Sequence, residues 1–192
     1  MRGTFILFEG VDNSGKTTQS RLLHEKNPNS ILLAFPDRTT TTGKLIDSYL
    51  KHEIEMDKEA IHFLFLSNRW ETANKICAKL DEGVDVIVDR YSYSGIAYAC
   101  ASGMDFDWLC VLENGLPKPD ITFLLSIPIE LTSQRENFGH ERYDKQTFQQ
   151  QVYDCFLKLI DESWIKIDAS QTIEKIHTEI IKIINEIPIP TL

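Results

Sequence analysis

Short apolar runs recur along the chain and are separated by longer stretches in which apolar and polar residues mix. Runs of four to six residues that are rich in Ile, Leu, Val and Phe are typical of buried strands. Five segments of this kind occur, and we expect each to form one strand of a sheet. They are Phe5–Phe8, Ile31–Phe35, Val84–Asp89, Ile121–Ser126 and Trp164–Asp168.

The segments between these runs have the length and end residues of helices. The longest has Asp57 near its start and Gly83 just past its end, which are residues suited to the two caps. Strands that alternate with helices predict an α/β fold of three layers, a parallel sheet with helices on both faces. The expected helices are Gly15–Lys26, a short helix ending at Leu50, Asp57–Leu80, Tyr91–Ser102, Phe106–Glu113, Ile129–Arg135, Lys145–Glu162 and Thr172–Glu186.

A phosphate-binding loop follows the first strand directly, as Gly10-x-x-x-x-Gly15-Lys16-Thr17. Glycines let such a loop curl so that its N–H groups face one hollow, while the lysine adds charge and the threonine hydroxyl can bind Mg²⁺. The pattern arises by chance in roughly one chain in a hundred. Its place between a strand and a helix favours binding of a nucleoside triphosphate. The expected ATP-binding residues are Gly10, Asn13, Ser14, Gly15, Lys16, Thr17 and Thr18.

Composition narrows the class of protein. The chain has 192 residues, 42% of them hydrophobic, which suits a single domain over residues 1–192. The net charge of −9 argues against a large nucleic-acid-binding surface and against a basic patch that would bind a membrane. No apolar stretch approaches the ~18 residues of a membrane span. We therefore expect a cytoplasmic or nuclear protein, with its four cysteines reduced and in or near the core.

Two aspartates near the loop are candidates for chemistry. Asp12 lies inside the phosphate loop, where it would either face a hydroxyl or amine of a second substrate or stabilise the loop as an Asx turn. Asp89 ends the third strand, the position of a second carboxylate that serves the metal in such enzymes. Its alternative is a surface salt bridge.

Basic and aromatic residues predict a second binding region. Arg38 and Arg90 follow the second and third strands, so both belong at the phosphate edge, where two guanidinium groups suit a substrate phosphate. Phe65 and Arg69 are four residues apart on one helix and share a face, as a base pocket requires. A Phe on a helix is more often a core residue, and we expect Trp70 to be one too.

A polar segment with one glycine lies near residues 135–144. We expect a mobile lid there that closes over the transferring phosphates, with Arg135 and Arg142 as its basic residues. The alternative is an ordinary solvated loop, which the sequence alone favours slightly.

Several strings together resemble thymidylate kinases of the eukaryotic and poxvirus kind: FEGVDNSGKTTQ, FPDRTTTTGKLIDSYL, HFLFLSNRWE, VDRYSYSGIAYA, GLPKPD, FGHERYD and IDAS. They cover nearly the whole chain in order. The resemblance implies a P-loop kinase fold with a five-stranded parallel sheet, and a homodimer. It also implies transfer of the γ-phosphoryl group of ATP to dTMP with Mg²⁺, a step of dTTP synthesis.

The resemblance gives roles to the matched positions. Lys16 and Thr17 would serve ATP and the metal, with Asp89 assisting. Asp12 would accept a hydrogen bond from the sugar 3′-hydroxyl. The substrate pocket would further contain Arg38 and Arg90 on the phosphate, Phe65 stacked on thymine, Arg69 at its O4, Phe35, Ser94 and Tyr98 along its walls, and Tyr143 near the sugar.

One position departs from the family pattern. Cellular eukaryotic members usually carry Arg after the loop aspartate, where this chain has Asn13. We expect Arg135, or else Arg142, to supply the missing charge; the alternative is a slower enzyme in which Lys16 and Mg²⁺ alone supply it. A deoxynucleoside kinase or another monophosphate kinase is the alternative function. A GTPase switch is disfavoured because the Asn-Lys-x-Asp motif does not occur.

Overall fold

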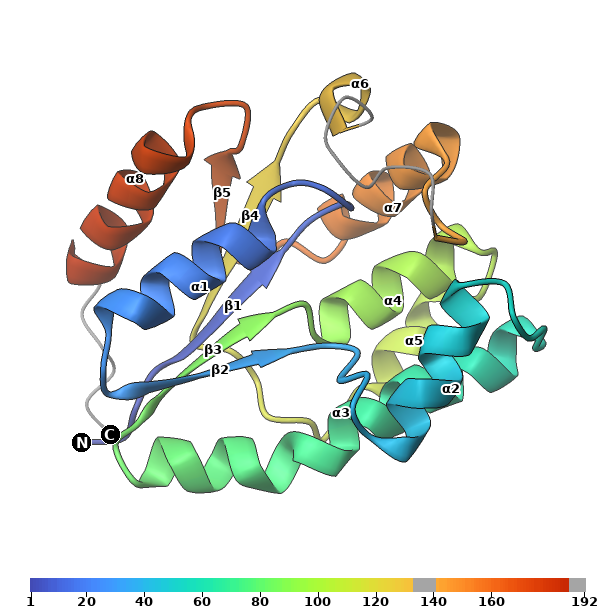
Figure 1. Cartoon of the computed structure of the whole chain (residues 1–192), viewed down its shortest axis with the longest axis horizontal. Coiled ribbons are helices and arrows are strands. Elements are labelled where there is room, and N and C mark those ends of the chain that lie inside the picture. The colour runs from blue at the N-terminus through green and yellow to red at the C-terminus, as the bar shows by residue number, and fades with distance from the viewer. Residues whose placement is uncertain (133–140, 187–192) are drawn as a thin grey trace.

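The structure is a computed structural model that describes residues 1–132 and 141–186. Within these ranges five parallel strands form one sheet, in the order β2-β3-β1-β4-β5. Helices cover both faces of the sheet (Figure 1). The expected three-layer fold is confirmed, and all five predicted strands form. They are β1 (Phe5–Glu9), β2 (Ser30–Ala34), β3 (Asp85–Asp89), β4 (Ile121–Ser126) and β5 (Trp164–Asp168).

Side chains of β1 alternate between two hydrophobic clusters. Phe5 and Leu7 pack in a cluster with Ile76 of the longest helix, whereas Ile6 and Phe8 pack in a second cluster with Leu23 of the first helix. The pleat sends successive side chains to opposite faces, so a strand with helices on both sides must be apolar throughout. Every residue of β1 is buried. This explains why its sequence shows a continuous apolar run.

The helices fall where the sequence predicts them, with shifted ends. Figure 1 shows α1 and α8 together on one side of the sheet, while α3 and α4 lie on the other. The helices are α1 (Lys16–Lys26), α2 (Thr41–Leu50), α3 (Lys58–Asp81), α4 (Ser92–Ala101), α5 (Phe106–Leu112), α6 (Ile129–Thr132), α7 (Gln146–Leu157) and α8 (Ile173–Glu186).

Two predictions about helices were wrong in detail. α7 ends at Leu157 instead of Glu162, because Asp161 accepts hydrogen bonds from the backbone N–H and hydroxyl of Ser163 and turns the chain into β5. Trp70 on α3 is 45% exposed and is not a core residue. The predicted helix Ile129–Arg135 is described only as far as Thr132.

The cysteines are free thiols, as predicted, but only Cys155 is buried and Cys77 is exposed. Among the described residues, no helix combines the length and apolar character needed to cross a bilayer.

Candidate active site

The phosphate loop connects β1 to α1 and has the curled backbone that its glycines predict. Gly10 and Gly15 have φ angles of +143° and +101°, which favour glycine. A Cβ at position 10 would lie 2.6 Å from the carbonyl oxygen of Leu125, so β4 also excludes a side chain there. Helix α1 begins at Lys16, so its positive end faces the loop.

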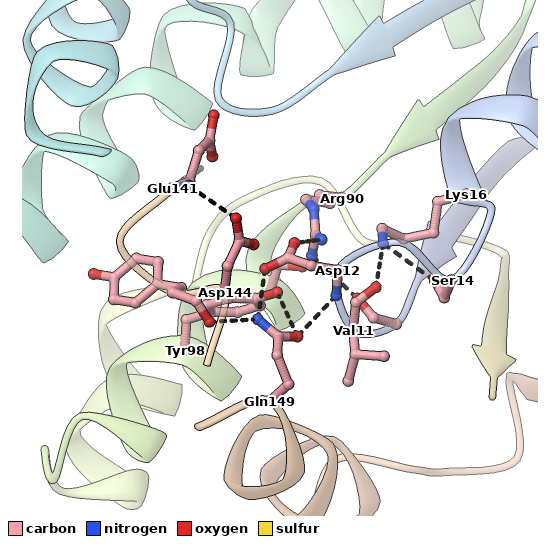
Figure 2. Close-up of polar contacts among 12 residues, drawn as sticks. Val11, Asp12, Ser14, Lys16, Arg90, Tyr98, Glu141, Asp144 and Gln149 are labelled. Carbon is pink, nitrogen blue, oxygen red and sulfur yellow. Dashed lines mark hydrogen bonds and ion pairs between the residues drawn. The ribbon is translucent and has the colours of Figure 1, made fainter. Parts of the chain in front are cut away.

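Lys16 is buried and folds back over the loop. Its Nζ donates to the carbonyl oxygen of Val11 at 2.6 Å and to Ser14 Oγ at 3.2 Å (Figure 2). Burial, with a smaller contribution from the charge of Arg90, lowers its pKa to about 8, although the nearby carboxylates oppose the shift. A phosphate that replaced these two neutral acceptors would stabilise the charged form of the buried ammonium group.

Thr17 and Asp89 meet where the loop faces the end of β3. Thr17 Oγ1 donates to Asp89 Oδ2 at 2.6 Å. Asp89 Oδ1 is buried and has no hydrogen-bond partner among the described residues. Hydroxyl and carboxylate oxygens are the ligands that Mg²⁺ takes from proteins when phosphates supply others. The pair therefore fits a magnesium ion.

Asp12 and Arg90 face each other across the site. Arg90 Nη2 forms an ion pair with Asp12 Oδ1, and its Nη1 donates to the carbonyl oxygen of Gly10 at 3.1 Å and to Ser94 Oγ at 3.2 Å. Arg90 has a φ of +63°, a left-handed conformation that is uncommon for arginine. The side chains of these adjacent residues therefore point to different partners: Asp89 contacts Thr17, whereas Arg90 contacts Asp12.

Glu9 is a buried carboxylate that the sequence analysis missed. It accepts hydrogen bonds from the backbone N–H groups of Tyr91 and Ser94 at 3.0 Å each, and from Ser94 Oγ at 2.5 Å. Burial raises its pKa, although these hydrogen bonds and Arg90 oppose the shift. Glu9 thus anchors the start of α4 beside Arg90. A charged residue directly after an apolar strand was the available signal.

A cavity of about 370 Å³ opens beside these residues, a size that suits a small-molecule ligand. Thr17 and Asp89 lie at its phosphate-loop end. All nine residues predicted for the second substrate line the same cavity, namely Asp12, Phe35, Arg38, Phe65, Arg69, Arg90, Ser94, Tyr98 and Tyr143. The structure therefore brings together side chains from five separate segments of the chain.

Arg38 and Arg69 reach the cavity with their guanidinium groups held by carboxylates. Arg38 pairs with Asp47 at 2.6 Å and with Glu141 at 2.8 Å. Arg69 is buried, and its Nε and Nη2 donate to Glu113, which caps the end of α5. Arg69 Nη1 makes no hydrogen bond with any described residue. That group is available to a ligand in the cavity.

Gln149 is a second residue that sequence analysis missed. It extends from α7 toward Asp12, as Figure 2 shows, and is completely buried. Its amide contacts Asp12 and the carbonyl oxygen of Tyr143. Gln149 shares the face of α7 that carries Val152 and Phe156, at helical spacing. A polar residue on an otherwise apolar face was the signal, hidden within the polar run Gln149–Gln151.

Arg142 does not lie where we expected it. Its Nε donates to the carbonyl oxygen of Tyr49 at 3.0 Å, its two Nη atoms bind Glu55 at 2.7 and 2.9 Å, and its guanidinium covers the Tyr49 ring. These contacts hold it on the α2–α3 side, outside the cavity. We therefore withdraw it as a catalytic candidate. Arg135 and most of the expected lid lie outside the described residues.

A family model for thymidylate kinase matches residues 8–180, which include every site residue described above. The chain belongs to the thymidylate kinase family. A thymidylate kinase of Dictyostelium discoideum is 47% identical over 93% of this chain and 83% of its own length. The thymidylate kinase of Homo sapiens is 41% identical, over 93% and 88% of the two chains.

The fold agrees with this assignment. The structure of the thymidylate kinase from Candida albicans superposes with a TM-score of 0.91 at 40% identity, covering 96% of this chain and 92% of that one. The family resemblance inferred from the sequence is confirmed. In this member of the family the phosphate loop and the cavity meet at Thr17 and Asp89.

Proposed function

We propose that this member of the thymidylate kinase family transfers the γ-phosphoryl group of ATP to the 5′-phosphate of dTMP, giving dTDP for dTTP synthesis. One observation carries the proposal. Arg38 and Arg90 line the same cavity as Asp12 and Thr17 of the phosphate loop. Two arginines at a cavity that adjoins a nucleotide loop favour a second substrate that already carries a phosphate.

The two substrates would divide the site between them. ATP would occupy the loop Gly10–Thr18, where Lys16 would exchange its internal acceptors for the β- and γ-phosphates. The dTMP phosphate would bind Arg38 and Arg90, and Asp12 would accept from the 3′-hydroxyl. At the other end of the cavity Phe65 would stack on thymine and Arg69 Nη1 would donate to O4.

Thr17 and Asp89 together would hold Mg²⁺. When bound, the ion neutralises charge on the transferring phosphates. The buried, unpartnered Oδ1 of Asp89 is the observation that supports this metal, within the residues described. Asn13 carries no charge, so a further cation would assist the transfer. Arg135 is our remaining candidate, and this assignment stays a prediction.

The test is ADP release with ATP and Mg²⁺ across a panel of acceptors. Thymine O4 accepts a hydrogen bond from Arg69, whereas cytosine has a donor at that position. We expect dCMP to be poorer than dTMP by about 10⁴-fold in kcat/KM, because two donors would face each other, and dUMP by about 10–200-fold for the lost methyl contact. Thymidine as a better acceptor than dTMP would instead indicate a nucleoside kinase.

We also propose that the protein forms a homodimer through α3 and α5. Phe63 and Trp70 of α3 and Trp108 and Val111 of α5 expose between 39% and 63% of their surface. The ring centroids of Phe63 and Trp108 lie 5.9 Å apart in an edge-to-face arrangement, so the exposed residues of α3 and α5 meet at this pair. Exposed aromatic patches favour protein contacts. The cytoplasm, or the nucleus, remains the compartment we expect.

A further inference from the structure

One buried amide connects the phosphate loop to the segment that follows residue 140. Gln149 Oε1 accepts from the backbone N–H of Asp12 at 2.8 Å, and Tyr98 Oη approaches the same oxygen at 3.5 Å. Gln149 Nε2 donates to Asp12 Oδ2 at 2.5 Å and to the carbonyl oxygen of Tyr143 at 3.0 Å. The amide thus uses both of its donors and both acceptor positions (Figure 2).

These contacts restrain Asp12 at its backbone and its side chain together. Asp12 Oδ2 is bound by Gln149, while Asp12 Oδ1 is bound by Arg90. The carboxylate therefore cannot rotate without losing a charge-assisted hydrogen bond on one side. Gln149 is completely buried, so water is not available to replace a lost partner.

The same amide restrains one wall of the cavity. The Tyr143 ring stacks on Phe148 at 5.1 Å and meets Tyr98 edge to face at 5.5 Å. Gln149 binds the Tyr143 backbone just behind this ring. A single side chain of α7 therefore sets the relative position of the phosphate loop and the Tyr143 wall.

We infer that Gln149 is a positioning residue for the sugar of the acceptor. It holds the Asp12 carboxylate in the orientation that accepts the 3′-hydroxyl, and it keeps the Tyr143 wall in register with Asp12. This inference rests on the proposed function, since it takes dTMP as acceptor. Gln149 acts through Asp12 and Tyr143, and its effect should be specific to substrates that carry a 3′-hydroxyl.

The test combines substitutions at Gln149 with two acceptors, dTMP and 3′-deoxythymidine monophosphate. Gln149→Met keeps the length of the side chain and removes all four hydrogen bonds. Gln149→Glu keeps the shape but loses both donors and faces Asp12 with a second carboxylate. Gln151→Glu, on the exposed side of α7, is the matched control.

We expect kcat/KM for dTMP to fall by about 10- to 100-fold in both Gln149 variants, the size of a lost hydrogen bond to a charged group. With the 3′-deoxy acceptor the loss should be several-fold smaller, so that the preference for dTMP shrinks. The Gln151→Glu protein should keep the wild-type preference. Thermal unfolding of each variant verifies folding, and Gln149→Met carries the test alone if Gln149→Glu does not fold.

A second comparison separates action through Asp12 from general damage. In an Asp12→Ala background, adding Gln149→Met should lower dTMP turnover by clearly less than the 10- to 100-fold loss it causes alone, because position 12 then has no acceptor for the 3′-hydroxyl and only the Tyr143 contact remains to be lost. Equal losses with both acceptors, or effects that simply multiply in the double variant, would overturn the inference. Failure of the proposed function would be seen differently, as wild-type protein that phosphorylates neither acceptor, and it would overturn both proposals.

Discussion

Lys16 combines a functional position with an unusual acid–base property. Its pKa of about 8 means that the ammonium group is charged below pH 8 and increasingly neutral above it. Only the charged form attracts phosphate, so kcat/KM for ATP should fall as pH rises through about 8, by about tenfold at pH 9. Steady-state kinetics between pH 7 and pH 9.5 measure this decline.

Lys16→Arg supplies the control for that profile. Arginine stays charged throughout this pH range, so the variant should show a flat profile even if its activity is lower. An identical decline in the wild-type and variant proteins would mean that another group, or the substrate itself, titrates. Lys16 would then not be the group that limits ATP use at high pH.

At the level of single residues, the sequence predicted site residues best when their position at the end of a strand determines where they lie in the fold. Arg38 and Arg90 follow strands of a parallel sheet, and strand ends must share one edge. Gln149 and Glu113 are different, because their importance depends on which helix packs beside which. Nothing local to either residue identifies its partner, and the partners lie 137 and 44 positions away.

Among the elements, α3 and α5 are joined by a buried ion pair that also reaches the cavity. Glu113 holds the guanidinium of Arg69, and a Cβ at position 95 would lie 2.5 Å from Arg69 Nη2, so α4 closes the third side. Glu113→Ala leaves a buried cation without its partner, which should destabilise the protein by about 3–5 kcal/mol in urea unfolding. The KM for dTMP should rise as Arg69 loses its orientation.

Two further variants interpret that result. Glu82→Ala removes the partner of Lys79 at the exposed end of α3, and its effect on unfolding should be small. The double variant Arg69→Met with Glu113→Leu replaces the pair with apolar groups and should recover most of the stability, but not the affinity for dTMP. Recovery of both would contradict our assignment of Arg69 to the base.

Element ends were the least predictable feature of the fold. The sequence of α7 does not show its end, which is marked in the structure by the backbone N–H groups of Lys158 and Leu159 bonding three residues back, before Asp161 forms the turn into β5. Trp70 illustrates a related limit. An aromatic residue on a helix is usually buried in its own chain, and sequence does not distinguish that core from a surface that binds another copy.

For the whole molecule, the alternation of strands and helices determined the architecture in advance. Five apolar runs, joined by helices, leave a parallel sheet as the arrangement that buries both strand faces. The order β2-β3-β1-β4-β5 then places the ends of β1 and β3 side by side. That adjacency brings Asp89 to Thr17, which is why one loop motif and one strand end sufficed to predict that these two side chains share a site.

The exposed apolar residues of α3 and α5 lead us to expect that two molecules associate. A stable interface buries about 800 Å² on each partner, around a central cluster of aromatic residues. The patch on α3 and α5 has such a cluster in Phe63 and Trp108, with Val111 63% exposed beside it. Lysine there would place an unpaired charge inside the interface, so Phe63→Lys with Val111→Lys should convert the dimer to a monomer in sedimentation velocity at micromolar concentration.

Leu157→Lys provides the comparison, since Leu157 of α7 is 45% exposed and lies outside the patch. This variant should sediment as the wild-type protein does. If Leu157→Lys dissociates the dimer and the patch variant does not, the molecules associate through α7 instead. A wild-type protein that sediments as a monomer would reject the dimer altogether.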